Sequence, residues 1–153
     1  MGPMDLDEWH IVRLFPDYVD MTIWTRRGPI SYADSQVSDA LADDLSAWER
    51  SMYSGMGDFE WQSVGLKRAF EDEGSSLAQR LAAELGNEFV VRYDEYDIRS
   101  DAPATNEAAY RFFRELAKAG RARELEEAGG SLDVGGFTAY APLSQATFRT
   151  GPR

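Results

Sequence analysis

Few residues of this chain have side chains suited to catalysis. The 153 residues include no cysteine and one histidine, His10. The absence of cysteine removes thiolate nucleophiles, disulfides and thiolate metal sites together. A serine–histidine–aspartate triad needs a histidine as its base, and no G-x-S-x-G elbow is present. We interpret His10 as a residue at the boundary of a strand and assign no catalytic residue.

Carboxylates are the remaining candidates for chemistry. Asp94, Glu95 and Asp97, with Asp101 shortly after them, follow the best strand of the chain. Ligands often bind beyond the carboxyl ends of parallel strands, and hard cations prefer oxygen ligands. The spacing is not the alternating pattern of a calcium loop, whose central glycine is also missing. We interpret the segment as an exposed acidic loop and expect no metal and no cofactor.

The distribution of charge says more about partners than about chemistry. Asp and Glu number 27 against 16 Lys and Arg, for a net charge of −11. The whole excess lies before residue 101, with 20 acids and 9 bases there and 7 of each afterwards. Nucleic acid and anionic membranes need clustered Lys and Arg, so neither is an expected partner. An acidic surface favours a basic protein partner, although many proteins are acidic only to stay soluble.

The front of the chain alternates between strands and helices. His10–Phe15 predicts a strand, and Tyr18–Trp24 predicts a second strand or an extended loop before a turn at Arg27–Pro29. Ser38 is suited to cap a helix whose apolar stripe recurs every three or four residues. That stripe consists of Val37, Leu41, Leu45, Trp48 and Met52, and Asp39, Asp43 and Glu49 are expected to lie away from it. A flexible loop is expected at residues 54–58.

A second helix is predicted over Gln62–Leu85, followed by the strand Phe89–Tyr93. Gly74 falls on the apolar stripe of this helix, where it either permits a close approach or breaks the helix in two. The apolar strand suggests burial on both faces and a central position. Because two helices separate it from the first strand, the two strands are expected to be parallel neighbours.

The rear of the chain predicts one helix and a hairpin. Thr105 is the expected cap of a helix that runs to about Ala128 and stops at Gly129-Gly130. A hairpin over residues 131–140 with a Gly135-Gly136 turn and a frayed tail over 146–153 follow. Residues 4–100 are interpreted as an acidic β-α-α-β core module and 101–153 as an extension of the same domain. Residues 1–4 resemble a cloning scar.

These elements predict an α+β fold, with three main helices packed on a small mixed sheet. The expected core is Val12, Leu14, Leu41, Leu45, Trp48, Phe70, Leu77, Leu81, Phe89, Val91, Phe113 and Leu116. No apolar run approaches the roughly 18 to 20 residues that span a bilayer, and no secretory signal is visible. A cytoplasmic location is the resulting expectation.

Two framework patterns resemble those of a known group of proteins. One is Pro16-Asp17-Tyr18 with Trp24 and the Ser38–Trp48 helix, and the other runs from Phe70 to Tyr93. Over roughly residues 10–97 they resemble small uncharacterised bacterial proteins, some of which look like immunity proteins of polymorphic toxin systems. The resemblance implies a toxin inhibitor and brings no catalytic residue with it.

The leading hypothesis is a non-catalytic protein-binding module of the immunity type, which captures a basic partner electrostatically. The expected contact residues are Asp39, Asp43, Asp44, Asp94, Glu95 and Asp97, with Tyr96 or Trp24 as anchors. An enzyme with carboxylate or carboxylate–metal chemistry after the Phe89 strand remains open. A pocket that joins Asp94 or Asp97 to Arg13 or Arg92 would favour it. A structural adaptor whose neutral rear third packs on a partner also remains open, and the oligomeric state is not predicted.

Overall fold

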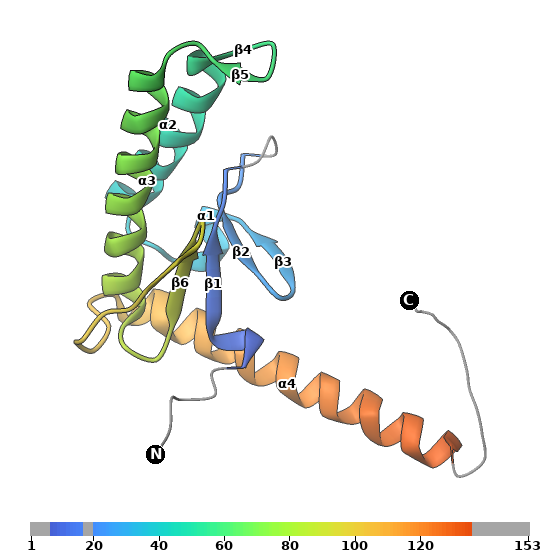
Figure 1. Ribbon diagram of the computed structural model, residues 1–153. Coiled ribbons are helices and arrows are strands. Elements are labelled where there is room, and N and C mark those ends of the chain that lie inside the picture. The colour runs from blue at the N-terminus through green and yellow to red at the C-terminus, as the bar shows by residue number, and fades with distance from the viewer. Residues whose placement is uncertain (1–6, 17–19, 136–153) are drawn as a thin grey trace. The chain divides into compact units, whose positions relative to one another are not determined.

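The computed structural model describes residues 7–16 and 20–135 (Figure 1). Its contacts divide the chain into two compact units, Met1–Ala117 and Lys118–Arg153. The first unit contains the five-stranded sheet and all the core residues found among the described residues. Within the described residues, no helix is long and apolar enough to cross a membrane.

The core unit is built on a five-stranded mixed sheet. In spatial order the strands are β3 (Gly28–Ile30), β2 (Ile23–Thr25), β1 (Ile11–Leu14), β6 (Val90–Tyr93) and β7 (Tyr96–Ile98). β1 and β6 are parallel, and the other pairs are antiparallel. The α+β class is therefore confirmed, as is the parallel pairing of the two predicted strands. β6 is an interior strand, and β1 occupies the middle of the sheet.

Two long helices follow the sequence pattern closely. α2 (Asp39–Gly55) begins at Ser38, whose hydroxyl accepts the Leu41 N–H at 3.2 Å. α3 (Val64–Leu85) begins at Ser63 in the same way and runs through Gly74 without a break. The two helices lie side by side, and α3 contacts β6 and β7 (Figure 1). The predicted stripe of α2 is buried throughout.

The expected flexible loop after α2 is instead a short hairpin of β4 (Met56–Gly57) and β5 (Glu60–Trp61). Its last residue, Trp61, folds back until its ring lies 5.0 Å from that of Phe70. Gly55 makes this possible, because a Cβ there would lie 2.6 Å from the Trp61 ring. Two further short elements, η1 (Glu8–His10) and α1 (Tyr32–Ser35), were not predicted. The turn expected at Arg27–Pro29 is also displaced, because it lies at residues 26–27 and β3 already begins at Gly28.

Glu49 corrects the expectation for α2. We expected it to lie away from the apolar stripe, but it is 2% exposed, and its carboxylate accepts the Tyr53 hydroxyl at 3.0 Å. The reason is positional, since Glu49 lies four residues after Leu45 and three before Met52 on the same helix. Hydrogen bonding permits a carboxylate at this buried position.

α4 (Glu107–Gly135) begins at Asn106, whose amide oxygen accepts the Ala109 N–H at 3.2 Å, and not at Thr105. Phe113 on its second turn packs edge-on against Phe89 at 6.2 Å and closes the core beside the start of β6. The helix passes through Gly129-Gly130 and includes residues 131–134, where a strand was expected. Glycine weakens a helix by about 1 kcal/mol without forbidding it. The rest of that hairpin and the tail lie outside the described residues.

The predicted core is confirmed at nearly every position. Phe70 is the exception, because it is only partly buried and packs against the edge of the core cluster. The other predicted core residues are all buried.

Candidate functional site

The predicted contact residues on α2 are all exposed, but they differ in how much free charge they carry. Asp44 forms an ion pair with Arg80 of α3 at 2.7 Å. Asp39 and Asp43 have no ion pair among the described residues. An exposed carboxylate that already contacts a guanidinium offers less field to a partner. The free negative charge among the predicted contact residues of α2 is therefore that of Asp39 and Asp43.

The second group lies on the β6–β7 hairpin. Asp94 and Glu95 form its turn, with Asp94 in the left-handed region at φ 56°. Asp tolerates this conformation better than most residues. Tyr96 is 68% exposed beside them. Asp94 and Glu95 make no ion pair among the described residues, so this turn combines free negative charge with an exposed aromatic ring.

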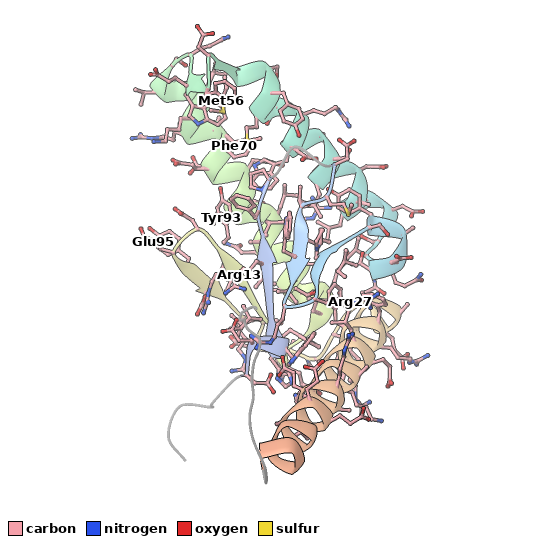
Figure 2. All side chains as sticks on the ribbon, turned by 90° about the vertical axis from the view of Figure 1, so that its right-hand side faces the viewer. Arg13, Arg27, Met56, Phe70, Tyr93 and Glu95 are labelled. Atoms are coloured by element: carbon pink, nitrogen blue, oxygen red, sulfur yellow. The ribbon has the colours of Figure 1, made fainter. Side chains whose placement is uncertain are left out.

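The two acidic groups do not form one continuous face. α2 packs against α3, whereas β7 is an edge strand of the sheet. Figure 2 shows Glu95 on the opposite side of the view from α2. The chain therefore presents two separate acidic surfaces, and an interface of ordinary size would cover one of them.

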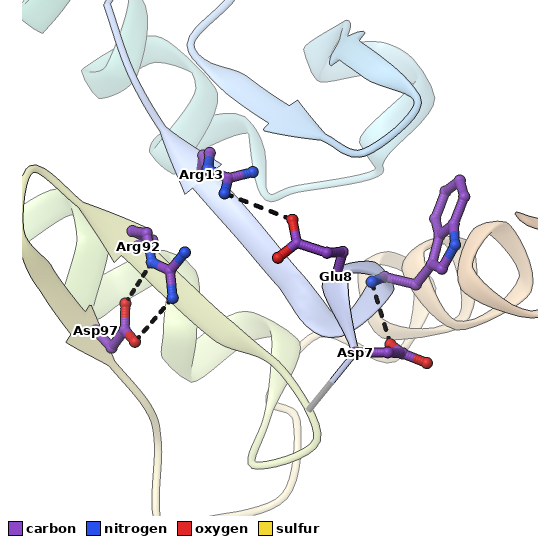
Figure 3. A network of polar contacts seen from close by, with 6 residues as sticks. Asp7, Glu8, Arg13, Arg92 and Asp97 are labelled. Carbon is purple, nitrogen blue, oxygen red and sulfur yellow. Dashed lines mark hydrogen bonds and ion pairs between the residues drawn. The ribbon is translucent and has the colours of Figure 1, made fainter. Parts of the chain in front are cut away.

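Trp24 and Asp97 lie on a third surface, the face of the sheet that carries Arg13 and Arg92. The strand register puts Trp24, Arg13, Arg92 and Asp97 in one cross-strand row. Arg92 donates to both Asp97 oxygens, at 2.7 and 3.1 Å, and Arg13 lies 3.6 Å from Glu8 (Figure 3). The hydrogen bond from Arg92 lowers the pKa of Asp97, and the same bond raises the pKa of Arg92. Asp97 is therefore already compensated within the chain.

Trp24 is held by its neighbours and only half-buried. Its ring meets that of Phe15 edge-on at 6.3 Å, and its indole N–H donates to the Phe15 carbonyl at 3.2 Å. It lies in the row with the arginines and not beside the hairpin turn.

A hollow of about 200 Å³ opens beyond the carboxyl ends of β1 and β6. We call it the aromatic hollow, because rings from four different segments line it together with two carboxylates. The lining residues that concern its chemistry are Phe15, Trp61, Phe70, Tyr93, Glu71 and Asp94. Asp94 and Glu71 of α3 line the same hollow, a relation that sequence reasoning did not predict.

The walls of the aromatic hollow are fixed by close packing. Phe70 stacks on Trp48 at 4.7 Å, and the Trp48 indole N–H donates to the Phe70 carbonyl at 2.9 Å. Tyr93 lies over Gly74, where a Cβ would collide with its ring and would lie 2.7 Å from Trp48. Gly74 therefore allows the close approach that the sequence offered as one of two alternatives.

The pKa of Tyr93 reflects the electrostatic environment of the hollow. Burial raises its pKa to about 12, with further contributions from the negative charges of Glu71, Asp94 and Asp72. Both effects oppose a negative charge on the phenol. The hydroxyl donates to the Glu71 carbonyl at 3.4 Å, a long contact. The phenol is therefore neutral at ordinary pH.

The arginines that the enzyme hypothesis placed in a pocket with Asp94 or Asp97 do not line the aromatic hollow. Asp94 lines the hollow with Glu71, while Arg13, Arg92 and Asp97 lie in the cross-strand row. Among the described residues, no three His, Asp or Glu side chains are arranged to hold a metal ion. A second hollow of about 330 Å³ lies near Gly86 and Tyr110, away from the predicted residues.

Residues 10–96, more than half of the chain, match the sequence model of the Serratia CdiI immunity protein-like family. The chain belongs to this family. No curated protein matches the chain. The match confirms the resemblance to immunity proteins and indicates a toxin-inhibitor role with a protein partner, the toxin. Every residue that lines the aromatic hollow falls within the matched segment.

Sequence reasoning found the acidic turn but missed the hollow beside it. Phe70 was assigned to the core, and Trp61 was given no definite place. The available signal was the pair of glycines, Gly55 and Gly74, near or on apolar helix stripes. Such glycines mark places where a large ring approaches the backbone.

Proposed function

We propose that this chain inhibits a toxin by binding a basic surface of it through the free carboxylates of the β6–β7 turn. The family supports an inhibitor with a protein partner. The observation that favours this turn is that Asp94 and Glu95 are uncompensated and stand beside the exposed ring of Tyr96. Free charge steers association, and tyrosine is enriched among the residues that dominate interface energies.

The other predicted residues have smaller parts in this proposal. Asp44 and Asp97 are paired with Arg80 and Arg92, so they contribute less to long-range attraction. Asp39 and Asp43 of α2 form the second acidic surface, and Trp24 serves as an anchor only for a partner that covers the cross-strand row. The mechanism is occlusion, in which the bound inhibitor covers a toxin surface built for an anionic substrate.

The test compares two variants with the same change in charge. The hairpin variant carries Asp94→Asn and Glu95→Lys, and the helix variant carries Asp39→Asn and Asp43→Lys. The ligand is the toxin domain that this chain is proposed to inhibit, and its association rate is measured over a range of salt concentrations. We expect the hairpin variant to slow association at low salt by roughly tenfold and to flatten its salt dependence.

Three outcomes contradict the proposal in different ways. Unchanged association in both variants removes electrostatic capture altogether. A larger effect in the helix variant moves the contact to α2. Failure of the intact chain to bind the toxin domain, or to protect cells that express it, removes the inhibitor role.

A further inference from the structure

The aromatic hollow is not required for electrostatic steering, and its construction needs an explanation. Its rings come from the residue after β1 and from β5, α3 and β6, and its two carboxylates come from α3 and the β6–β7 turn. Phe15 is 56% exposed at its rim, where its ring meets that of Trp24 edge-on. An exposed ring beside a formed hollow is typical of an interaction site.

The size of the hollow limits what it can accept. About 200 Å³ is several times the roughly 30 Å³ that one water occupies in the liquid. It is smaller than the roughly 300 to 1,000 Å³ of sites that enclose a small-molecule ligand. A single side chain of a partner protein fits this range better than a metabolite or a lone water.

The charge of the hollow determines which kind of partner side chain it can bind. Glu71 and Asp94 are exposed and make no ion pair among the described residues. Lys67 and Arg68 lie one turn before Glu71 on α3 without pairing with it. Two free carboxylates beside ring faces attract a cation, and a planar guanidinium both stacks on rings and donates to carboxylates.

We propose that the aromatic hollow receives one arginine side chain of the partner protein, with its guanidinium against the rings and its N–H groups donating to Glu71 and Asp94. This rests on the proposed function for the identity of the partner, but not for the binding of the side chain. The rings are already fixed by Gly55, Gly74 and Trp48, so little ordering is needed on binding.

The first experiment needs no toxin. N-butylguanidinium is titrated into the ¹⁵N-labelled full chain, and the indole N–H signal of Trp61 is followed by NMR. N-butylurea, which has a similar shape and no charge, is the matched probe. We expect a saturable shift at millimolar concentration with the cation and none with the urea.

Variants test whether the two carboxylates of the hollow are needed to bind the guanidinium. Glu71→Gln and Asp94→Asn together remove two charges from the hollow, and asparagine keeps the left-handed turn at residue 94. Asp39→Asn with Asp43→Asn removes two charges from α2 as the control. We expect the shift to disappear in the first double variant and to persist in the second. No saturable shift in the intact chain, an equal shift with the urea, or a shift that survives in the hollow variant overturns the proposal.

The second experiment links the hollow to the partner. Glu71 belongs to the hollow and not to the acidic turn, so Glu71→Gln is measured alone against the toxin domain. We expect about a tenfold or greater loss of affinity, chiefly through faster dissociation. Unchanged affinity overturns the proposal that the aromatic hollow binds the partner, and it does not contradict electrostatic capture by the β6–β7 turn. Binding of N-butylguanidinium without any toxin binding has the opposite meaning, because it preserves the cation site and removes the inhibitor role.

Discussion

Single glycines determine how the aromatic residues of this protein pack. Gly74 lies under Tyr93 and Trp48, and Gly55 lies under Trp61. In both places the missing Cβ is the space into which a ring fits. Gly65 lies on the same helix as Gly74, but its nearest neighbour is 3.9 Å from a built Cβ. The same residue type therefore has opposite effects at two positions of α3.

Gly74→Ala is expected to destabilise the fold by about 1 to 3 kcal/mol, because the new methyl overlaps the Trp48 and Tyr93 rings. Gly65→Ala is the control and is expected to be neutral or stabilising by up to about 1 kcal/mol, since alanine favours helix. Urea unfolding of both variants measures the difference. Equal free energies of unfolding would show that the rings move aside freely.

Tyr93 also makes stability depend on alkaline pH. Its pKa is raised to about 12 by burial and by nearby carboxylates, whereas an unfolded tyrosine titrates near 10. The folded state therefore keeps its proton when the unfolded state loses it, and this contribution falls as the pH rises from about 10 to 12. The measurement is the difference in free energy of unfolding between the wild type and Tyr93→Phe. We expect it to be flat below pH ~9 and to shrink above it, and parallel curves would contradict this.

At the scale of elements, one carboxylate joins three helices. Glu84, near the end of α3, accepts the Ser38 N–H at 2.9 Å and the Ser38 hydroxyl, at the start of α2. It also accepts the Asn106 amide at 2.9 Å, at the start of α4. Asn106 in turn donates to the Gln36 carbonyl at 2.9 Å. Two helix N-termini are thereby tied to the end of a third.

Glu84→Ala is expected to cost about 1 to 3 kcal/mol, because several donors at this junction lose their acceptor together. Glu84→Gln retains one acceptor and is expected to cost less. Glu73→Ala, at an exposed position of the same helix, is the control and is expected to stay within about 0.5 kcal/mol. Thermal unfolding compares the three. A loss no greater for Glu84→Ala than for Glu73→Ala would contradict the role of the junction.

The elements also show what local sequence can predict. α2 and α3 were predicted because a stripe of apolar residues and a capping serine are both local signals. The β4–β5 hairpin and β7 were missed, since short strands depend on their neighbours more than on their own residues. Asn106 replaced Thr105 as the cap because its partners lie on α3 and near α1, out of reach of any local pattern.

The site was predictable to the same extent. The acids at 94–97 stand out in composition, but the compensation of Asp44 by Arg80 joins residues 36 apart and cannot be seen from spacing. The aromatic hollow brings together rings from four segments, so only the folded chain shows it. Charge was readable from the sequence, whereas which charges remain free was not.

At the scale of the whole molecule, the family match and the hydrophobic core have different limits. The match ends at residue 96, whereas Ala109, Phe113 and Leu116 of α4 are also buried in the core. Within the part of the chain that the structure describes, no core residue comes from the second unit. The start of α4 is therefore part of the folded unit, although it lies beyond the matched segment.

Two truncations test this division. A chain that ends after Arg121 is expected to unfold cooperatively with nearly unchanged stability, because it retains every core side chain among the described residues. A chain that ends after Ser100 exposes the surfaces of Phe89 and its neighbours that Phe113 covers. At about 1.5 to 3 kcal/mol for each buried side chain, this loss is comparable to a typical total stability. Circular dichroism on heating distinguishes the two, and similar melting curves would contradict the role of α4.

The parallel pairing of β1 with β6 has a consequence for synthesis. Ile11 lies opposite Val90, so the middle strand of the sheet has to wait for its partner while two long helices are translated. Such distant pairing slows folding, because closing a long loop costs entropy before any contact is gained. On the ribosome, β2 is the one neighbouring strand with which β1 can pair until β6 emerges. The contact at the centre of the sheet therefore forms only after residues 90–93 have been synthesised, and the nascent chain carries an unpaired edge of β1 until then.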